Sequence, residues 1–164
     1  MKTLLILRHA KSSWNNAHLA DHDRPLNERG KQDAPRVGQA IKSRDLVPDL
    51  IITSTAERAL STAEAAAIHC DYDHELRIER RFYLAGPETY LSVLRQLEGD
   101  PACLMVVGHN PGLEDLLHHL TQRLEAMPTA ALAQVSLPIQ RWSDLRESTQ
   151  GILEWYWWPK IDEP

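Results

Sequence analysis

Three short segments of the chain are continuously apolar and differ from the amphipathic stretches around them. They are Thr3–Leu7, Leu50–Ile52 and Leu104–Val107. Runs of this length without polar alternation are typical of strands buried on both faces, as in a parallel sheet covered by helices. The pattern therefore predicts three buried strands.

Amphipathic stretches follow the second and third runs. Residues 56–69 place alanines on one face, and the preceding Ser54 forms a capping-box pattern with Glu57, which predicts that a helix begins there. After the third run, Asn110 fits an N-cap and Pro111 the first helical position, with leucines continuing at helical spacing. Each of these two strands is therefore expected to lead into a helix.

Two further helices are predicted. One opens at Asn27 and continues to about Ile41, with apolar residues at helical spacing. Pro35 is expected to kink this helix or to mark where its regular part begins. The other spans about Glu88 to Leu97.

The alternation of strands and helices predicts an α/β fold, a three-layer α/β/α sandwich with a mostly parallel sheet flanked by helices. Two more apolar segments, Leu132–Leu137 and Ile152–Trp158, are expected to pair as a hairpin at one side of the sheet. The tryptophans of the second segment are interpreted as packing residues. Because no internal repeat or Ser/Gly-rich linker divides the chain, residues 1–164 are expected to form a single domain.

The charge of the chain narrows the range of ligands. Its 18 Lys and Arg are outnumbered by 23 Asp and Glu, which gives a formal net charge of −5, and no basic block occurs. This balance argues against a nucleic-acid partner, because such binding depends on releasing counterions from phosphates. An anionic ligand would have to be held by a local cluster of positive groups.

Other broad classes are also disfavoured. No apolar run approaches the roughly 18–20 residues of a membrane span, and the N-terminal segment is too short for a signal peptide, so a cytoplasmic protein without a membrane partner is expected. Cys70 and Cys103 have the spacing of neither a disulfide framework nor a zinc site.

The candidate chemistry lies where the buried runs end, because ligands of open α/β sheets collect at the carboxyl ends of the strands. Arg8 and His9 follow the first run, Arg58 lies in the first turn of the helix after the second, and His109 follows the third. Arginines beside helix N-termini favour phosphate, and a neutral imidazole can attack phosphorus. Together these residues predict a phosphate site.

Three motifs carry a family resemblance. Residues 5–10, with Arg8-His9-Ala10, resemble the Arg-His-Gly signature of the histidine phosphatase superfamily (phosphoglycerate-mutase-like). Residues 54–59 resemble its second motif, and residues 106–111 its third. The segment Asp23–Asn27, followed by Gly30, is similar to the short branch that includes SixA-type phosphohistidine phosphatases. The resemblance implies a phosphoglycerate-mutase-like fold.

The resemblance also implies roles for individual residues. His9 would be the nucleophile that becomes transiently phosphorylated. Arg8, Arg58 and His109 would hold the phosphoryl oxygens and offset the charge that develops in transfer. Arg24 would be an additional phosphate contact. No cofactor and no metal are implied.

The residue that would act as general acid stays open between Glu79 and Glu88, which both lie between the second and third motifs. An imidazole leaving group has a pKa of about 6.5, far below that of an aliphatic alcohol, so a phosphohistidine bond breaks with less help from an acid. This chemistry favours phosphohistidine over sugar phosphates as substrate without excluding the latter.

The leading hypothesis is a metal-independent phosphohydrolase that acts through His9, with phosphohistidine on a protein as the preferred substrate. One alternative is a small-molecule phosphomonoesterase, for a sugar or related phosphate, or a mutase of the same fold. An alternative of a different class is a non-catalytic phosphate-binding module. The oligomeric state stays open, and Lys11 and Trp14 are expected either to line the entrance of the site or to pack on the surface.

A further group of residues is weighed as a metal site. His18 and His22, with Asp21 and Asp23, have a spacing that suits metal ligands on a helix. Asp, Asn and Pro crowd this stretch, however, and favour a solvated loop near the mouth of the site.

Overall fold

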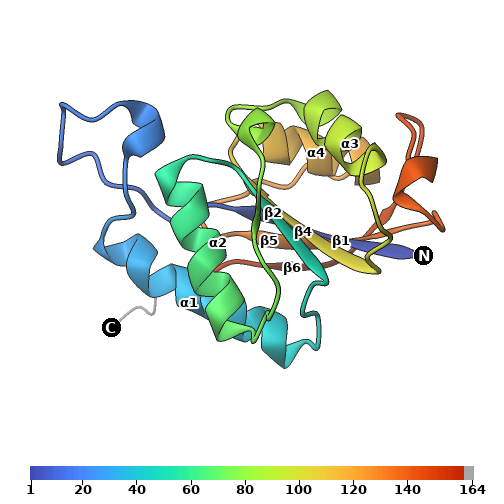
Figure 1. Ribbon diagram of the computed structural model, residues 1–164, viewed down its shortest axis with the longest axis horizontal. Coiled ribbons are helices and arrows are strands. Elements are labelled where there is room, and N and C mark those ends of the chain that lie inside the picture. The colour runs from blue at the N-terminus through green and yellow to red at the C-terminus, as the bar shows by residue number, and fades with distance from the viewer. Residues whose placement is uncertain (161–164) are drawn as a thin grey trace.

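A six-stranded sheet forms the centre of the computed structural model, which describes residues 1–160, with strand order β3-β2-β4-β1-β5-β6 (Figure 1). The strands β1 to β4 run parallel to one another, whereas β5 pairs antiparallel with both β1 and β6. The strands are β1 (Lys2–Arg8), β2 (Leu50–Thr53), β3 (Arg77–Ile78), β4 (Cys103–Gly108), β5 (Leu132–Leu137) and β6 (Ile152–Trp157).

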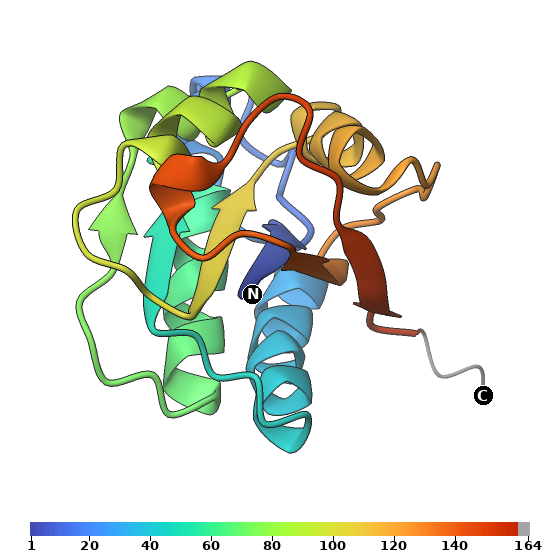
Figure 2. The same cartoon turned by 90° about the vertical axis from the view of Figure 1, so that its right-hand side faces the viewer.

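Helices cover both faces of this sheet (Figure 2). Consecutive residues of β1 point to opposite faces, as strand geometry requires: Leu5 packs with α1 and α2, and Leu4 with α3 and α4. The three-layer α/β/α architecture and the mostly parallel sheet are therefore confirmed. The helices are α1 (Glu28–Ser43), α2 (Glu57–His69), α3 (Pro87–Arg95) and α4 (Gly112–Thr121). Within residues 1–160, no helix is both long and apolar enough to cross a membrane.

Helix α1 begins where its sequence predicts. The side chain of Asn27 accepts a hydrogen bond of 2.8 Å from the backbone N–H of Gly30, which satisfies one of the free donors of the first turn. The helix continues through Pro35 to Ser43, so the expectation that its regular part begins at Pro35 is wrong.

Helix α2 matches the predicted range of about 56–69, but the capping box predicted at its start is wrong. The helix begins at Glu57, its N-cap is Ala56, and no capping side chain is present. The hydroxyl of Ser54 instead lies 2.8 Å from Nε2 of His109, while Ser61 donates to the Glu57 carboxylate. The capping box does not form, because the Ser54 hydroxyl accepts from the backbone N–H of Ala56 at 3.2 Å instead of from that of Glu57, and it also contacts His109.

The predicted cap of α4 is also displaced by one residue. Pro111, rather than Asn110, is the N-cap, and the helix begins at Gly112. The amide of Asn110 donates to Glu114 and to the carbonyl of Met127, at 2.8 and 2.9 Å. It thereby ties the start of α4 to the chain that precedes β5.

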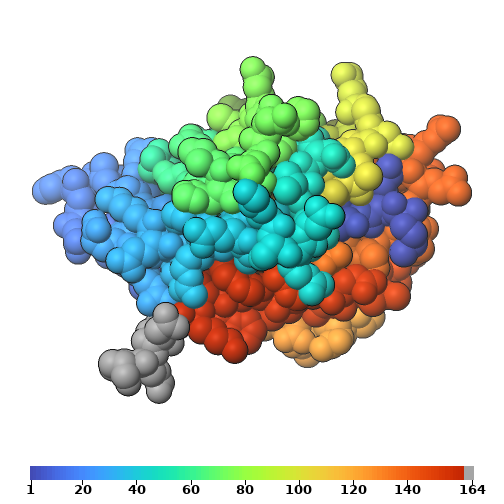
Figure 3. Space-filling model, turned by 90° about the horizontal axis from the view of Figure 1, so that it is seen from below, coloured from blue at the N-terminus to red at the C-terminus, as the bar shows by residue number. Residues whose placement is uncertain are grey.

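The predicted hairpin of β5 and β6 is present at one edge of the sheet, where β6 lies beside α1 on the face seen in Figure 3. Trp155 and Trp157 pack against the core beneath α1 and α2, and the guanidinium of Arg44 lies 4.7 Å above the ring of Trp155. Trp158, the third tryptophan of this segment, remains 40% exposed.

The Asn27 cap yields a stability prediction. We expect Asn27→Ala to lower the free energy of unfolding by about 1 kcal/mol, because the N–H of Gly30 loses its acceptor. Urea denaturation measures this loss. Asn27→Asp should retain most of the stability, and Asn15→Ala, in an exposed loop, serves as the control. A loss no larger than that of the control would contradict a capping role.

Candidate active site

The carboxyl ends of β1 and β4 border a pocket of about 350 Å³. It brings together all five residues that the sequence predicts to handle phosphate, contributed by β1, α2, the end of β4 and the segment after β1. These five are Arg8, His9, Arg24, Arg58 and His109. The other residues that line the pocket are Lys11, Ser12, Trp14, Asp21, Leu84, Asn110 and Thr129.

His9 follows the last residue of β1 and is only 7% exposed. Its Nδ1 lies 2.7 Å from the carbonyl oxygen of Ala10. Because a carbonyl can only accept, Nδ1 must carry the proton and the lone pair of Nε2 is free. Burial, reinforced by the charge of Arg58, lowers the pKa of His9 to about 4. The ring is therefore neutral near pH 7 and has one nucleophilic nitrogen.

His109 lies beside His9, with the two ring centroids 5.2 Å apart. It is 2% exposed, and its Nε2 is within hydrogen-bond distance of the Ser54 hydroxyl. Burial, together with the neighbouring His9 and Arg58, lowers the pKa of His109 to about 3. The second histidine is thus also neutral, so neither ring adds positive charge to that of the arginines.

Hydrogen bonds to protein oxygens fix the positions of the guanidinium groups of Arg8 and Arg58. Nη1 of Arg8 donates to the carbonyl of Met127 at 2.9 Å, and burial lowers the pKa of Arg8 from its usual value. Arg58 donates from Nη1 to the backbone oxygen of Asp21 at 2.7 Å and from Nη2 to its carboxylate at 2.9 Å. A guanidinium carries five N–H donors, so both arginines keep donors for a ligand.

Asp21 is the pocket residue whose contacts the sequence does not predict, since there it is weighed only as a metal ligand. It opens a short 3-10 helix, η1 (Asp21–Asp23), and its carboxylate accepts from Arg24 at 2.9 Å and from the hydroxyl of Tyr83 at 2.6 Å, besides Arg58. The Tyr83 hydroxyl, followed by the two guanidinium groups, holds the pKa of Asp21 well below its usual value. The sequence signal for this contact is the spacing of Asp21 three residues before Arg24, which suits an ion pair between the two side chains.

The stretch weighed as a metal site has a different role. Asp21 faces arginines, and Nε2 of His22 lies 2.8 Å from the hydroxyl of Thr55. In the part of the chain that the structure describes, no three His, Cys, Asp or Glu side chains are grouped so that they could hold a metal ion. The segment is therefore one wall of the pocket, attached through ion pairs.

Thr62 connects the two sides of the pocket. Its fully buried hydroxyl accepts from the backbone N–H of Ala10 at 2.9 Å and donates to the carbonyl of Arg58 at 2.7 Å. One side chain of α2 therefore sets the position of the loop that carries His9 relative to the turn that carries Arg58.

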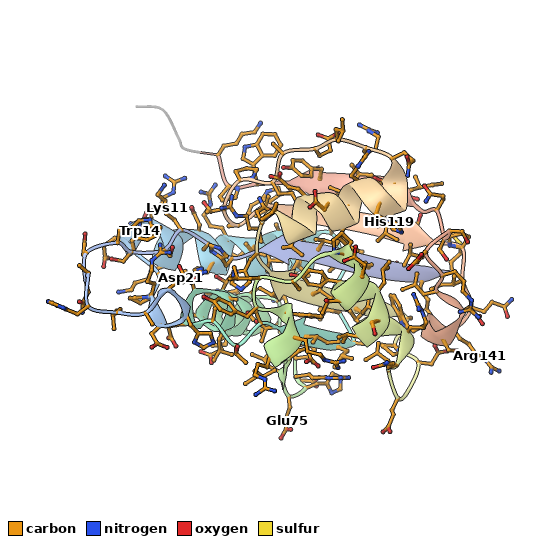
Figure 4. The ribbon with its side chains drawn as sticks, turned by 90° about the horizontal axis from the view of Figure 1, so that it is seen from above. Lys11, Trp14, Asp21, Glu75, His119 and Arg141 are labelled. Atoms are coloured by element: carbon orange, nitrogen blue, oxygen red, sulfur yellow. The ribbon has the colours of Figure 1, made fainter. Side chains whose placement is uncertain are left out.

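Neither candidate for the general acid lines the pocket. Glu79 is paired with Arg81 at 2.9 Å, and this contact lowers the pKa of its carboxyl group. Glu88 lines another hollow, of about 520 Å³, together with His119. Figure 4 shows His119 far from Asp21, Lys11 and Trp14. Among the described residues that line the pocket, Asp21 is the one carboxylate.

Comparison with known proteins agrees with this geometry. Residues 4–83 match the histidine phosphatase superfamily (branch 1). A crystal structure from Agrobacterium tumefaciens, named as a proposed phosphohistidine phosphatase SixA, superimposes with a TM-score of 0.82 and 28% identity, over 96% of this chain and 98% of the other. Residues 4–83 are thus similar to the histidine phosphatase superfamily, and the chain as a whole shares its fold with the Agrobacterium structure.

Two curated relatives match more locally. An uncharacterised chloroplast protein of Arabidopsis thaliana is 32% identical over 123 residues, 70% of this chain and 56% of its own length. A 2,3-bisphosphoglycerate-dependent phosphoglycerate mutase of Bifidobacterium longum is 33% identical over 104 residues, 59% of this chain and 42% of its own length. The chain thus spans about half the length of these relatives.

The bridging hydroxyl of Thr62 yields a second prediction. We expect Thr62→Val to lower the free energy of unfolding by about 1–3 kcal/mol, because it leaves the buried N–H of Ala10 without an acceptor. Thr89→Val, at a partly exposed position in α3, is the matched control and should change stability by less than about 0.5 kcal/mol. Equal stability of the two variants in urea would contradict the bridge.

The lowered pKa of His9 predicts that stability depends on pH. Between about pH 6.5 and about pH 4 the unfolded chain binds a proton at this residue and the folded chain does not, so lowering the pH favours unfolding. Each such histidine contributes up to about 1.4 kcal/mol per pH unit. Urea unfolding at about pH 7 and about pH 4.5 should therefore show a smaller loss for His9→Asn than for the wild type. Equal losses would be inconsistent with a buried, neutral His9.

Proposed function

We propose that this protein is a metal-independent phosphohydrolase that works through a phosphorylated His9, and that its substrate is phosphohistidine on a protein. The observation that carries the proposal is the state of His9. Its Nδ1 proton is held by the Ala10 carbonyl, while its Nε2 lone pair is free in a pocket that also holds Arg8 and Arg58. A nucleophile and the groups that bind phosphate thus meet in one place.

The reaction would proceed in two displacements. Nε2 of His9 attacks phosphorus while the bond between phosphorus and the leaving nitrogen breaks. Water then attacks the same phosphorus while its bond to Nε2 breaks, which releases inorganic phosphate and regenerates His9. Arg8, Arg24 and Arg58 supply N–H donors to the phosphoryl oxygens, where charge is concentrated during transfer. In so buried a site these donors act more strongly than they would in water.

The ionisation of the pocket supports phosphohistidine as the substrate. An aliphatic alcohol leaves as a strong base and needs a proton donor, whereas imidazole leaves with a pKa of about 6.5. Asp21, the carboxylate of the pocket, is kept ionised by Tyr83 and two arginines, so it is a poor acid. The similarity to the Agrobacterium structure agrees with this choice.

A small phosphate ester is the second candidate substrate. The local similarity to a phosphoglycerate mutase favours this candidate, because the name of that relative refers to small phosphorylated metabolites. The pocket geometry distinguishes the two candidates only through the acid, so a direct substrate comparison is required.

The test incubates the purified protein, in EDTA, with a carrier protein phosphorylated on histidine and with a panel of sugar phosphates. We expect hydrolysis of the carrier protein in EDTA and an acid-labile phosphoenzyme. His9→Asn should reduce turnover at least about 10³-fold, the scale expected for loss of a nucleophile. His18→Asn, in an exposed loop, should retain wild-type turnover.

The other outcomes are equally informative. Turnover that survives in His9→Asn would exclude His9 as nucleophile, and phosphate binding without turnover in the wild type would indicate a binding module. Activity lost in EDTA would exclude the metal-free reaction. Hydrolysis of sugar phosphates alone would favour the second candidate.

A further inference from the structure

Two large apolar side chains stand exposed at the mouth of the pocket. Trp14 is 77% exposed and Leu84 is 64% exposed, and both line the pocket that holds His9. They come from different segments, the loop after β1 and the turn before α3. Single exposed apolar residues are ordinary on protein surfaces, but two of them bordering one catalytic pocket form a shared feature.

The ring of Trp14 packs against a guanidinium. The guanidinium of Arg24 lies 3.2 Å from the centroid of its ring, and this arginine is itself held by the carbonyl of Ser13 and the carboxylate of Asp21. The indole therefore rests on a fixed cation while most of its surface faces solvent. Figure 4 shows Trp14 beside Lys11, at the end of the molecule where Asp21 lies.

Leu84 is held in an unusual backbone conformation. Its φ of 54° lies in the left-handed region, which costs a residue with a Cβ roughly 1–2 kcal/mol. Tyr83, directly before it, is anchored by its hydroxyl to Asp21. A bulky apolar residue is thus kept strained and exposed at the pocket mouth, a combination that is found where strain serves function.

We propose that Trp14 and Leu84 form a docking rim for the protein that carries the phosphohistidine. The inference rests on the proposed function and names the surface that selects its substrate. The occupant is a folded protein whose phosphohistidine is surrounded by apolar side chains. Because His9 is only 7% exposed, a phosphohistidine must enter the pocket side chain first, which brings the backbone around it to the height of the rim.

The chemistry of the rim suits a protein partner better than a small metabolite. A tryptophan offers a large, rigid contact area at a small entropic cost, and tryptophans are enriched among residues that dominate binding energy. A phosphoryl group bound by Arg8 and Arg58 inside the pocket gains nothing from apolar groups outside it. The rim is thus expected to discriminate between substrates by what surrounds the phosphohistidine.

The test compares two substrates with the same leaving group, a carrier protein phosphorylated on histidine and free phosphohistidine. Leu84→Asn removes the apolar side chain, and asparagine accepts the left-handed conformation more readily, so the fold is retained. We expect its kcat/KM for the protein to fall about tenfold, mainly through KM, since tenfold corresponds to about 1.4 kcal/mol. Its kcat/KM for free phosphohistidine should stay within about twofold of the wild type.

Trp14→Gln and a matched control complete the experiment. Trp14→Gln should lower the ratio of kcat/KM for the protein to that for free phosphohistidine by about tenfold. Ile68→Asn is the control, because Ile68 is 71% exposed but lies near the end of α2 that is remote from the pocket. It should leave both substrates unaffected.

Two results would contradict the proposal that Trp14 and Leu84 form a docking rim. Equal losses on both substrates would mean that the residues act on the pocket, and no loss on the protein would mean that the partner does not touch them. A wild-type protein that hydrolyses sugar phosphates but not the phosphorylated carrier would instead refute the proposed function, so the two failures are distinct.

Discussion

The parallel pairing of β1 with β4 at the centre of the sheet is the constraint on which the pocket depends. The register places Arg8 opposite Gly108, and the backbone N–H of His9 donates to the carbonyl of Gly108 at 3.2 Å. The two histidines that follow these strands therefore emerge side by side. A shift of one residue in this pairing would turn every side chain of β1 to the opposite face and separate the rings.

Burial of the pocket shapes its chemistry in two opposite ways. It removes protons from His9 and His109, since a charged imidazole is poorly solvated there, and it concentrates positive charge in arginines that cannot lose theirs. An acidic protein with a net charge of −5 thus presents a cationic pocket. Asp21 and the Met127 carbonyl orient these cations and offset part of their mutual repulsion.

The sequence predicts the parts of the fold that repeat a pattern, and fails where one side chain serves a distant partner. The central strands follow from their apolar runs, whereas β3, with two residues, is too short for a pattern to show. Ser54 has the local signature of a helix cap, yet it contacts His109, 55 positions away. Capping rules consider neighbours along the chain, and this contact exists only in the folded sheet.

The residues of the candidate site also fall into those that the sequence predicts and those that it does not. The end of each apolar run marked Arg8, His9 and His109, because the topology of parallel strands brings such ends together. Asp21 could not be found by that rule, since it lies in a loop and reaches the pocket through Arg58 and Tyr83. Its role depends on how the loop folds back, which hydrophobic periodicity does not encode.

The contact between the His9 ring and the Ala10 carbonyl has a consequence for how this site tolerates substitution. The acceptor that selects the tautomer is a main-chain atom of the very next residue, so no exchange of a partner side chain can delete it. In enzymes where a carboxylate orients the catalytic histidine, a point mutation of that carboxylate leaves the wrong tautomer. Here any residue that fits at position 10 brings the same oxygen, which accounts for alanine serving where the family more commonly has glycine.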